Sequence, residues 1–306
     1  MKYKNILMLW PSKSEYWGRE IAKKNLIHID ATYIRQGLVG NILRKTAIQC
    51  GTGFSLFFEK WKDQIYTYDL IIVQANMITK DIPKWIRNRG YKGRLVYWYW
   101  DPVSGCVSPD RIDRRCCELW SFDKVDCEKY NMKFRETFFV TNEIEIKRQR
   151  NSTEYKHDIL FVGRDKGRAD KLDRIQKELE YNKLTTYFYV VATKPYYISA
   201  GRMKKQLDYQ EVLIMLQGSR AILEINQKDQ SGLSMRTMES IFFSKKLITD
   251  NAAIMQSEIY RPENIYVLGQ DKRNIRDFMN VKYIEYSQDF LNRYLFETWI
   301  TSFAEE

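Results

Sequence analysis

Two residue types on which many active sites depend are scarce or poorly placed in this chain of 306 residues. It has only two histidines, His28 and His157, and neither lies near a cysteine in the sequence. The five cysteines form no C-x-x-C pair, which argues against a structural zinc site. The adjacent Cys116 and Cys117 indicate reduced thiols in a cytosolic protein rather than a disulfide framework.

Long hydrophobic runs are also missing. A run of about 18 uncharged apolar residues, long enough to span a bilayer as a helix, occurs nowhere in the chain. The mostly apolar run at residues 5–10 is too short for the core of a signal peptide. Hydrophobic residues still make up 44% of the chain and charged residues 29%, which predicts a packed core and excludes a disordered chain. We therefore expect a cytoplasmic protein, at most peripheral on the inner face of the cell membrane.

The net charge of +11 is concentrated at one end of the chain. Residues 1–100 carry +10 of it and residues 101–306 carry +1. Such a basic region predicts an anionic partner: nucleic acid, a phospholipid surface or a phosphorylated substrate. The segment 34–65 alternates cations with apolar residues, which is typical of a basic helix with Phe and Trp on its other side lying on an anionic bilayer. A core-facing pair of helices with a solvated basic side explains it equally well. Its residues of interest are Arg35, Leu38, Val39, Ile42, Leu43, Arg44, Lys45, Phe54, Leu56, Phe57, Phe58, Lys60, Trp61 and Lys62.

Short apolar runs recur along the chain, and most are followed by a segment of helical periodicity. The expected strands are 6–10, 70–73, 95–100, 118–122 and 137–140, then 159–163, 186–191, 221–225, 246–249 and 265–268. The expected helices include 169–180, 210–216, 235–243 and an amphipathic closing helix over 288–303. Strands alternating with helices indicate parallel sheets covered on both faces. With the polar stretch 141–157 as a linker, the pattern predicts an α/β protein of two Rossmann-like domains, 1–150 and 151–306, facing a cleft.

One candidate site lies where a helix begins after the expected strand 221–225. Ser231, Gly232 and Ser234 stand at this helix start, where unpaired backbone N–H groups and hydroxyl donors form an anion site. Arg236 lies in the first turn, where the helix dipole disfavours a cation unless it faces an anion or solvent. An ordinary capped helix, with Ser231 or Ser234 as N-cap, explains the same serines without any ligand.

A second candidate loop follows the first strand of the second series. Gly163 and Gly167 allow the backbone to approach a ligand, and Arg164, Lys166 and Arg168 supply donors for phosphate. The loop matches neither G-x-G-x-x-G nor the P-loop. A solvated basic turn remains the alternative.

These two loops, with the expected strand 246–249, resemble the C-terminal domain of GT-B-type glycosyltransferases of bacterial capsule, exopolysaccharide and lipopolysaccharide biosynthesis. In that group the first strand of the domain ends in a V-G-R-like loop, present here at 162–164. The donor site resembles S-G-L-S-M-R-T-M-E-S-I-F-F-S-K-K-L-I-T-D-N at 231–251. The resemblance covers about residues 157–270. In the first half it is limited to the order of strands and helices and to W-S-F-D-K-V-D-C-E-K-Y at 120–130.

The resemblance implies a glycosyltransferase that moves a sugar from a nucleotide diphosphate donor to a glycan or lipid-linked acceptor in surface polysaccharide biosynthesis. It implies no metal and no other cofactor, because a helix N-terminus and cations can stabilise the leaving diphosphate. The lack of any D-x-D motif agrees with this. The implied donor-binding residues are Gly163, Arg164, Ser231, Gly232, Leu233, Ser234, Arg236 and Glu239.

The resemblance also implies a role for each of these groups. Gly232, Leu233 and Ser234 would donate hydrogen bonds to the diphosphate. Arg164 and Arg236 would neutralise it as it leaves. The carboxylate of Glu239, inside the helix, would hold the hydroxyls of the ribose.

The stereochemical outcome does not follow from the resemblance. Retaining members often carry Glu-x7-Glu ending at the position of Glu239, but the chain has Ser231 eight positions earlier. An inverting enzyme needs a base on the N-terminal side to deprotonate the acceptor hydroxyl. Asp101, directly after an expected strand, is the favoured candidate, since ligands gather at the carboxyl ends of strands. Glu15, in the loop after the first strand, is the second, although a cap or turn role is favoured for it.

Two other functions stay open. A nucleotide-sugar epimerase of the same fold would need several acidic groups and histidines in its site, and two histidines argue against it. A nucleic-acid-binding protein would use the basic first third and show an affinity that falls steeply with salt. No helix-turn-helix, zinc-finger or RNA-recognition signature supports it. We therefore expect no nucleic-acid partner, and assign the basic surplus to an acceptor side that meets a membrane face or a lipid diphosphate.

Overall fold

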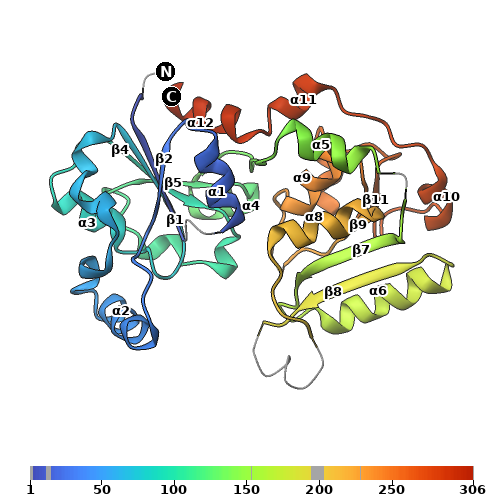
Figure 1. Cartoon of the computed structure of the whole chain (residues 1–306), viewed down its shortest axis with the longest axis horizontal. Coiled ribbons are helices and arrows are strands. Elements are labelled where there is room, and N and C mark those ends of the chain that lie inside the picture. Colours follow the sequence, from blue (N-terminus) through green and yellow to red (C-terminus); the bar gives the residue numbers. More distant parts are fainter. Residues whose placement is uncertain (1–2, 12–14, 153, 194–202, 228, 306) are drawn as a thin grey trace. The chain divides into compact units, whose positions relative to one another are not determined.

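The computed structural model of the chain divides into two compact units. It describes residues 3–11, 15–152, 154–193, 203–227 and 229–305 (Figure 1). Unit 1 comprises Met1–Val140 and Arg293–Glu306, and unit 2 comprises Thr141–Asn292. This division differs from the expected 1–150 and 151–306 at both ends of the second domain, because residues 141–150 pack with unit 2 and the C-terminal segment packs with unit 1. Each unit is an α/β layer structure around its own sheet.

Unit 1 holds a six-stranded parallel sheet in the order β2-β1-β3-β4-β5-β6. Its strands are β1 (Ile6–Trp10), β2 (His28–Ala31), β3 (Leu70–Gln74), β4 (Arg94–Tyr99), β5 (Glu118–Ser121) and β6 (Lys133–Phe134). Four of the five strands expected in this half are confirmed. The prediction of a strand at 137–140 is wrong: Phe139 makes only an isolated bridge to Leu295, and the run is apolar because Phe138 and Phe139 are fully buried.

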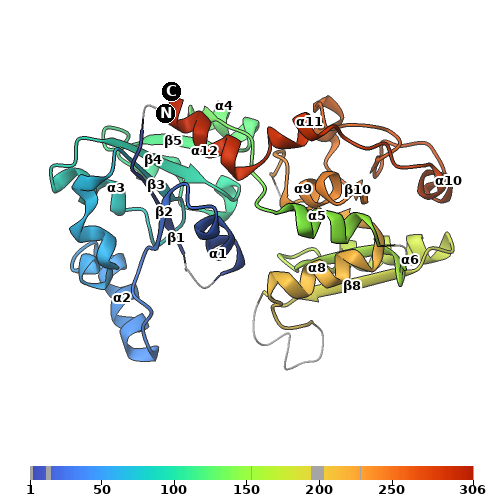
Figure 2. The ribbon, with the colours of Figure 1, turned by 45° about the horizontal axis from the view of Figure 1, so that its top comes forward.

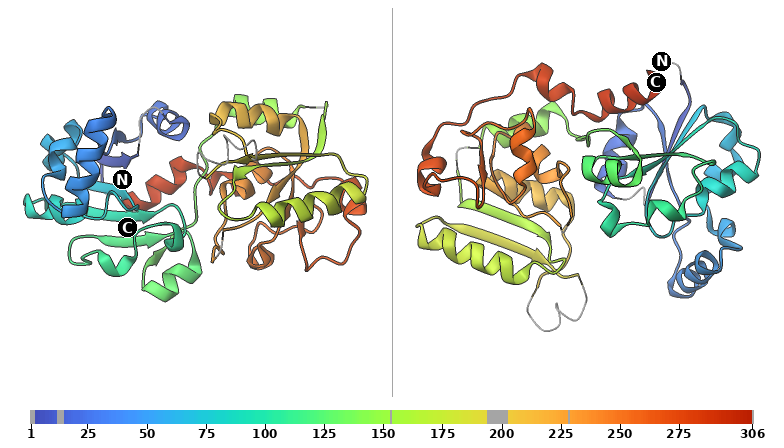
Figure 3. Two further views of the ribbon diagram at one scale, coloured as in Figure 1. Left: turned by 90° about the horizontal axis from the view of Figure 1, so that it is seen from below. Right: turned by 180° about the vertical axis from the view of Figure 1, so that it is seen from behind.

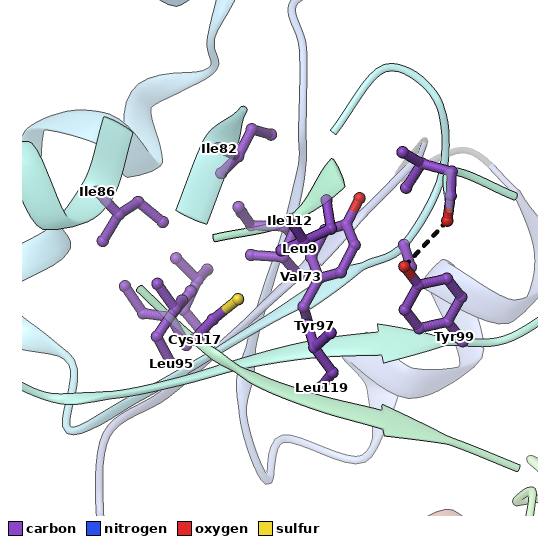
Figure 4. Close-up of a cluster of buried hydrophobic side chains, with 14 of the residues drawn as sticks. Leu9, Val73, Ile82, Ile86, Leu95, Tyr97, Tyr99, Ile112, Cys117 and Leu119 are labelled. Carbon is purple, nitrogen blue, oxygen red and sulfur yellow. Dashed lines mark hydrogen bonds between the residues drawn. The ribbon is translucent and has the colours of Figure 1, made fainter. Parts of the chain in front are cut away.

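The two faces of this sheet bury different side chains. Its helices are α1 (Tyr16–Lys23), α2 (Leu38–Cys50), α3 (Ile82–Asn88), α4 (Lys124–Tyr130) and α12 (Phe296–Glu305). On one face Leu9 and Tyr97 pack against Ile82 and Ile86 of α3 (Figure 4). On the other face Trp98 packs with α12. The alternation of side chains along β4 therefore buries its aromatic residues on both faces.

Helix α12 completes the second face of unit 1. The rings of Phe138 and Trp98 lie 4.5 and 5.1 Å from that of Trp299, centroid to centroid. Arg94 donates a hydrogen bond of 2.8 Å to the carbonyl of Phe303. The sequence predicted one closing helix over 288–303, but the structure has two helices, α11 (Gln288–Asn292) and α12. In Figure 2, α12 lies over the sheet of unit 1.

Unit 2 holds a five-stranded parallel sheet in the order β11-β10-β9-β7-β8. Its strands are β7 (His157–Arg164), β8 (Thr186–Val191), β9 (Ser219–Glu224), β10 (Lys246–Thr249) and β11 (Ile265–Val267). Its further helices are α5 (Glu143–Arg150), α6 (Ala169–Tyr181), α8 (Tyr209–Gln217), α9 (Met235–Phe242) and α10 (Ile275–Asn280). All five strands expected in this half are confirmed, and α6 lies along β8 (Figure 3).

The expected linker at 141–157 is wrong, because residues 143–150 within it form α5. The side chain of Asn142 caps this helix by accepting a hydrogen bond of 2.9 Å from the backbone N–H of Glu145. Acidic residues occupy its first turn and basic residues its last, which suits the helix dipole. Gln149 is fully buried and donates to the carbonyl of Leu213 in α8 at 2.8 Å. The charge pattern therefore belongs to a capped surface helix.

The strand order of unit 2 sets the place of its candidate site. Strand β7 has β9 on one side and β8 on the other, so the loops after β7 and β9 leave neighbouring strands at the same edge of the sheet. In open parallel sheets, ligands bind outside the carboxyl ends of strands at such a switch point. Among the described residues, no helix is long and apolar enough to span a membrane.

Candidate active site

The start of α9 is built by a capped turn after β9. Ser234 is the N-cap, and its Oγ accepts a hydrogen bond of 2.9 Å from the backbone N–H of Arg236. Leu233 is buried and anchors the turn in the core. Asn251, after β10, donates to the carbonyl of Ser231 at 3.1 Å, so the turn is tied to the next strand end as well. The capping role predicted for one of the two serines is thus confirmed for Ser234.

A buried carboxylate lies beneath this helix start. Glu224, the last residue of β9, is 2% exposed and accepts hydrogen bonds from three hydroxyl groups. Thr237 and Thr249 donate at 2.8 and 2.5 Å, and Ser234 is the third donor. The Ser234 hydroxyl thus accepts from the helix and donates to Glu224, which fixes the orientation of the turn. Sequence reasoning missed Glu224, and its only signal was a carboxylate that closes an apolar strand.

Glu239 lies inside α9 and has no exposed surface. One carboxylate oxygen accepts a hydrogen bond of 2.7 Å from the hydroxyl of Tyr209, the first residue of α8. The other oxygen forms an ion pair with the guanidinium of Arg236. Burial raises the pKa of Glu239, while Arg236 and the Tyr209 hydroxyl favour its charged form. Arg236 is a cation in the first turn of α9, where the helix dipole disfavours it unless it faces an anion. Glu239 is that anion.

The loop after β7 is fixed from within by Asp165 and Arg168. Buried Asp165 accepts hydrogen bonds from the backbone N–H groups of Gly167 at 3.0 Å and Ala169 at 2.9 Å. The Arg168 guanidinium donates to three backbone carbonyls: those of Asp165, of Arg164 at 2.6 Å and of Ile225. Since Ile225 directly follows β9, Arg168 ties the loop after β7 to the end of β9. The guanidinium of Arg168 therefore donates its hydrogen bonds to the backbone of the protein itself.

The other cations of this loop face solvent. Arg164 and Lys166 are exposed, and Arg164 donates to the side-chain oxygen of Gln206 at 2.6 Å. Gly167 has a φ of +80°, a conformation that favours glycine. A Cβ atom at Gly163 would lie 3.2 Å from the ring of Phe161, so a larger residue there would crowd the strand end. Of the three cations predicted to contact phosphate, the structure leaves Arg164 and Lys166 at the surface.

The two candidate bases lie in unit 1. Asp101 is exposed and comes two residues after the end of β4, and its backbone carbonyl accepts from the thiol of Cys106 at 3.7 Å. Glu15 is exposed and occupies the N-cap position of α1, but its side chain makes no capping hydrogen bond. Their loops leave the carboxyl ends of β4 and β1, which belong to the same parallel sheet.

Comparison with known proteins identifies the fold. No protein-family model matches the sequence, and no curated protein matches it either. The structure of the lipopolysaccharide outer core galactosyltransferase WaaB in its apo form aligns over 98% of this chain and 98% of its own, with 13% identity and a TM-score of 0.52. The chain has the GT-B fold.

Two further structures support the GT-B assignment. Sucrose-phosphate synthase from Thermosynechococcus elongatus aligns over 91% of this chain and 88% of its own, with 11% identity and a TM-score of 0.50. An α-glucosyltransferase in complex with UDP and DNA aligns over 99% and 90%, with 10% identity and a TM-score of 0.50. The predicted α/β class with two parallel sheets is confirmed. At these identities the likeness concerns the fold alone.

Within this GT-B fold, unit 2 brings its predicted site residues together. The segments 163–168 and 231–239 follow the paired strands β7 and β9, and Arg168 bonds the first of them to Ile225 at the end of β9. Asp101 and Glu15 belong to the other unit. The residues that sequence reasoning missed are buried Glu224 and half-buried Tyr209, which hold the candidate groups in place.

Proposed function

We propose that this protein is a glycosyltransferase that moves a sugar from a nucleotide diphosphate donor to a glycan or lipid-linked acceptor in surface polysaccharide biosynthesis. The observation that carries the proposal is the pair of fixed loops at the β7 and β9 strand ends of a GT-B fold. The similar structures include a lipopolysaccharide galactosyltransferase and a glucosyltransferase in complex with UDP, which supports a nucleotide-sugar donor and a surface-glycan acceptor.

The donor diphosphate is proposed to bind at the start of α9. The backbone N–H groups of Gly232 and Leu233 donate to its oxygens, and the positive end of the helix dipole favours its charge. The exposed guanidinium of Arg164 approaches from the neighbouring loop, next to Gly163. These groups stabilise the negative charge that grows on the leaving diphosphate without a metal ion. Ser231 and Ser234 contribute by shaping the turn.

The acceptor hydroxyl must lose a proton as it attacks the anomeric carbon. We assign this step to a carboxylate of unit 1, with Asp101 as first candidate and Glu15 as second. Both are exposed at strand-end loops, where an acceptor can reach them. An Asp101→Asn variant would keep donor binding and lose turnover.

Titration calorimetry with UDP, GDP, CDP and ADP tests the donor site. We expect one of these to bind, and Arg164→Ala to lower its affinity by about tenfold, the effect of losing one charge-assisted hydrogen bond. Arg174→Ala is the matched control, because Arg174 is an exposed arginine on α6 whose recorded hydrogen bond is within its own helix. If none of the four nucleotides binds, the donor assignment fails.

A membrane surface is proposed as the second partner, and the structure changes which residues would form it. Phe54, Phe58 and Trp61 are buried in the core, contrary to the expectation that the aromatic residues lie against a bilayer. The exposed large apolar residues of the segment 34–65 are instead aliphatic, and all except Ile34 and Leu56 lie on α2, which projects from unit 1 (Figure 2). Those on α2 are Leu38, Val39, Ile42 and Leu43, with Leu38 80% exposed.

The charge near α2 favours an anionic bilayer over a neutral one. Arg35 and Lys45 are exposed beside the apolar residues, and Lys60 is exposed nearby in sequence. Cosedimentation with vesicles of phosphatidylglycerol and of phosphatidylcholine tests the surface. We expect binding to the anionic vesicles only, and loss of it in Ile42→Glu with nucleotide binding intact. Equal binding of Ile42→Glu and the wild type would exclude α2 as the contact.

A further inference from the structure

We propose that a pocket between α6 and α10 of unit 2 binds a neutral oligosaccharide. The choice of the growing glycan as its natural occupant rests on the proposed function, whereas the binding itself follows from the chemistry of the pocket. The pocket would hold the glycan at a place separate from the two loops that we assign to the donor.

The pocket has a volume of about 610 Å³ and lies between α6 and the segment that leads from β11 into α10. Pockets that bind small molecules usually measure about 300–1,000 Å³. Among the described residues that line it, none belongs to the segments 163–168 and 231–239. Helices α6 and α10 pack into one core on the same face of the sheet. The apolar part of the lining is formed by Ile175, Leu179, Leu268 and Ile275.

The polar rim of the pocket is fixed by bonds within the protein. Lys171 of α6 forms an ion pair of 2.6 Å with Asp250, which follows β10. The Nε–H group of Arg273 donates to the carboxylate of Asp271 at 2.8 Å. The hydroxyl of Tyr266, in β11, donates to the backbone carbonyl of Arg273 at 3.0 Å. A rim that is already bonded loses little freedom when a ligand binds, which favours affinity.

One carboxylate of the pocket is available to a ligand. Glu178 is exposed on α6, and its carboxylate forms no hydrogen bond or ion pair within the described residues. Burial, and after it the charges of Asp271 and Glu178, raise the pKa of Tyr266, so both carboxylates lie near the Tyr266 hydroxyl. Each oxygen of a carboxylate has two acceptor positions, and neighbouring sugar hydroxyls supply donors for them.

The balance of charge and apolar surface favours a neutral sugar chain. The lining carries the carboxylates of Glu178, Asp250 and Asp271 against the two cations of Lys171 and Arg273. An anionic ligand, a nucleotide included, would face this surplus of negative charge. A concentrated positive charge would be repelled by the two cations, and a wholly apolar ligand would desolvate the charged rim. An oligosaccharide suits both parts, because the C–H faces of its rings pack on apolar side chains and its hydroxyls both donate and accept.

Methyl NMR of the full-length protein with labelled isoleucines tests the pocket. Ile175 and Ile275 line it, and Ile241 on α9 is the reference for the proposed donor site. The neutral probes are maltopentaose, cellopentaose and chitopentaose, and the anionic probe is pentagalacturonate. We expect at least one neutral probe to shift Ile175 and Ile275 without shifting Ile241, with UDP absent or present. Pentagalacturonate should bind at least about tenfold more weakly.

Two variants change the pocket in different ways. Glu178→Ala should lower the affinity for the bound probe by about tenfold, the effect of losing a charged hydrogen-bond acceptor. Leu268→Trp should abolish binding by filling the pocket. Asp173→Ala is the matched control, because Asp173 is an exposed carboxylate on the same helix that does not line the pocket, and it should leave the affinity unchanged. If Leu268→Trp does not fold, Glu178→Ala carries the test, since this side chain is exposed.

The inference is overturned if no neutral probe binds, if binding shifts Ile241 instead of the two pocket isoleucines, or if Glu178→Ala binds as the wild type does. Pentagalacturonate that binds as tightly as the neutral probes would overturn the assignment of a neutral ligand. Each of these results leaves the proposed function standing. A protein that binds a neutral probe in the pocket but none of UDP, GDP, CDP and ADP would instead overturn the proposed function and leave the pocket as an oligosaccharide site.

Discussion

The two units of this protein are built from different kinds of interior. All eight tryptophans of the chain lie in unit 1, where Trp61, Trp98 and Trp299 are buried among other aromatic rings. Unit 2 has no tryptophan, and beside its candidate site it buries carboxylates that are hydrogen-bonded, Glu224 and Glu239. The aromatic interior of unit 1 is therefore held together by apolar packing. The candidate site of unit 2 is held together by a network of hydrogen bonds.

This difference suits different tasks. Polar networks fix direction, because each hydrogen bond has a preferred geometry, whereas apolar packing fixes mainly volume. In unit 2, Glu224 and Arg168 hold the two loops to which we assign the proposed donor site. In unit 1 the candidate groups, Asp101 and the apolar face of α2, are exposed. Tryptophan fluorescence thus reports on unit 1 alone, which allows the two interiors to be perturbed separately.

The largest expected effect comes from the aromatic interior. Trp299→Ala should destabilise unit 1 by about 3–5 kcal/mol, because it removes a buried ring that packs on Phe138 and Phe303. Urea unfolding followed by tryptophan fluorescence measures the loss. Thr301→Ala on the same helix is the control, and it should change the midpoint little. Nucleotide affinity should be unchanged in both variants, and a loss of affinity in Trp299→Ala would contradict the separation of the two interiors.

A change in the polar interior of unit 2 should instead affect unit 2 and nucleotide affinity, and leave unit 1 unchanged. Glu224→Gln should destabilise unit 2 by about 2 kcal/mol, since the buried hydroxyls of Thr237 and Thr249 and the half-buried hydroxyl of Ser234 lose a charged acceptor. It should also lower nucleotide affinity, because the Ser234 cap loses its anchor. Urea unfolding followed by far-ultraviolet circular dichroism and calorimetry measure the two effects. A Glu224→Gln variant with wild-type stability and affinity would show that the network does not support the site. The fluorescence of unit 1 in buffer should remain that of the wild type.

The smallest expected effect is a dependence on pH in unit 2. Burial lowers the pKa of Lys245 to about 8, and burial is also the main reason that the pKa of Lys246 falls to about 8. In the unfolded chain both titrate near 10.5. Between these values the unfolded state binds more protons than the folded state, so the stability of unit 2 should rise with pH from about 8 to 10.5 and be lowest below 8.

Unfolding monitored by circular dichroism at a series of pH values measures this rise, on the order of 1 kcal/mol for each lysine. The double variant Lys245→Met, Lys246→Met should flatten it, because methionine fills a similar volume without a charge. A rise of the same size in this double variant would assign the pH dependence to other groups.

Much of the fold could be predicted from the sequence because buried parallel strands are continuous apolar runs. The strand His28–Ala31 was missed, since it is short and contains Asp30 among its four residues. Helix α5 was taken for a linker because its few apolar residues suggested no buried face. Ile144 is indeed 82% exposed, and the residue that buries this helix is Gln149. A helix that is buried through a glutamine shows no periodic pattern of hydrophobic residues in its sequence.

The site was predictable to the same degree. The glycine, the serines and the cations of the two loops stand out in the sequence, and the structure brings their strand ends together. The three-residue spacing of Arg236 and Glu239 was visible, but only the structure shows that the carboxylate of Glu239 is fully buried and accepts a hydrogen bond from Tyr209. Glu224 could not be found, because its three hydroxyl donors lie 10, 13 and 25 residues after it in the sequence.

The return of α12 to unit 1 has a consequence for how the protein can be taken apart. Since unit 1 contains residues from both ends of the chain, unit 2 is an insertion within it, entered after Val140 and left before Arg293. A single cut after Val140 would therefore leave α12, and with it Trp299, on the fragment that contains unit 2 instead of with the rest of unit 1. The piece to excise for study by itself is 141–292, and the rest must be rejoined across the gap to keep its aromatic core whole.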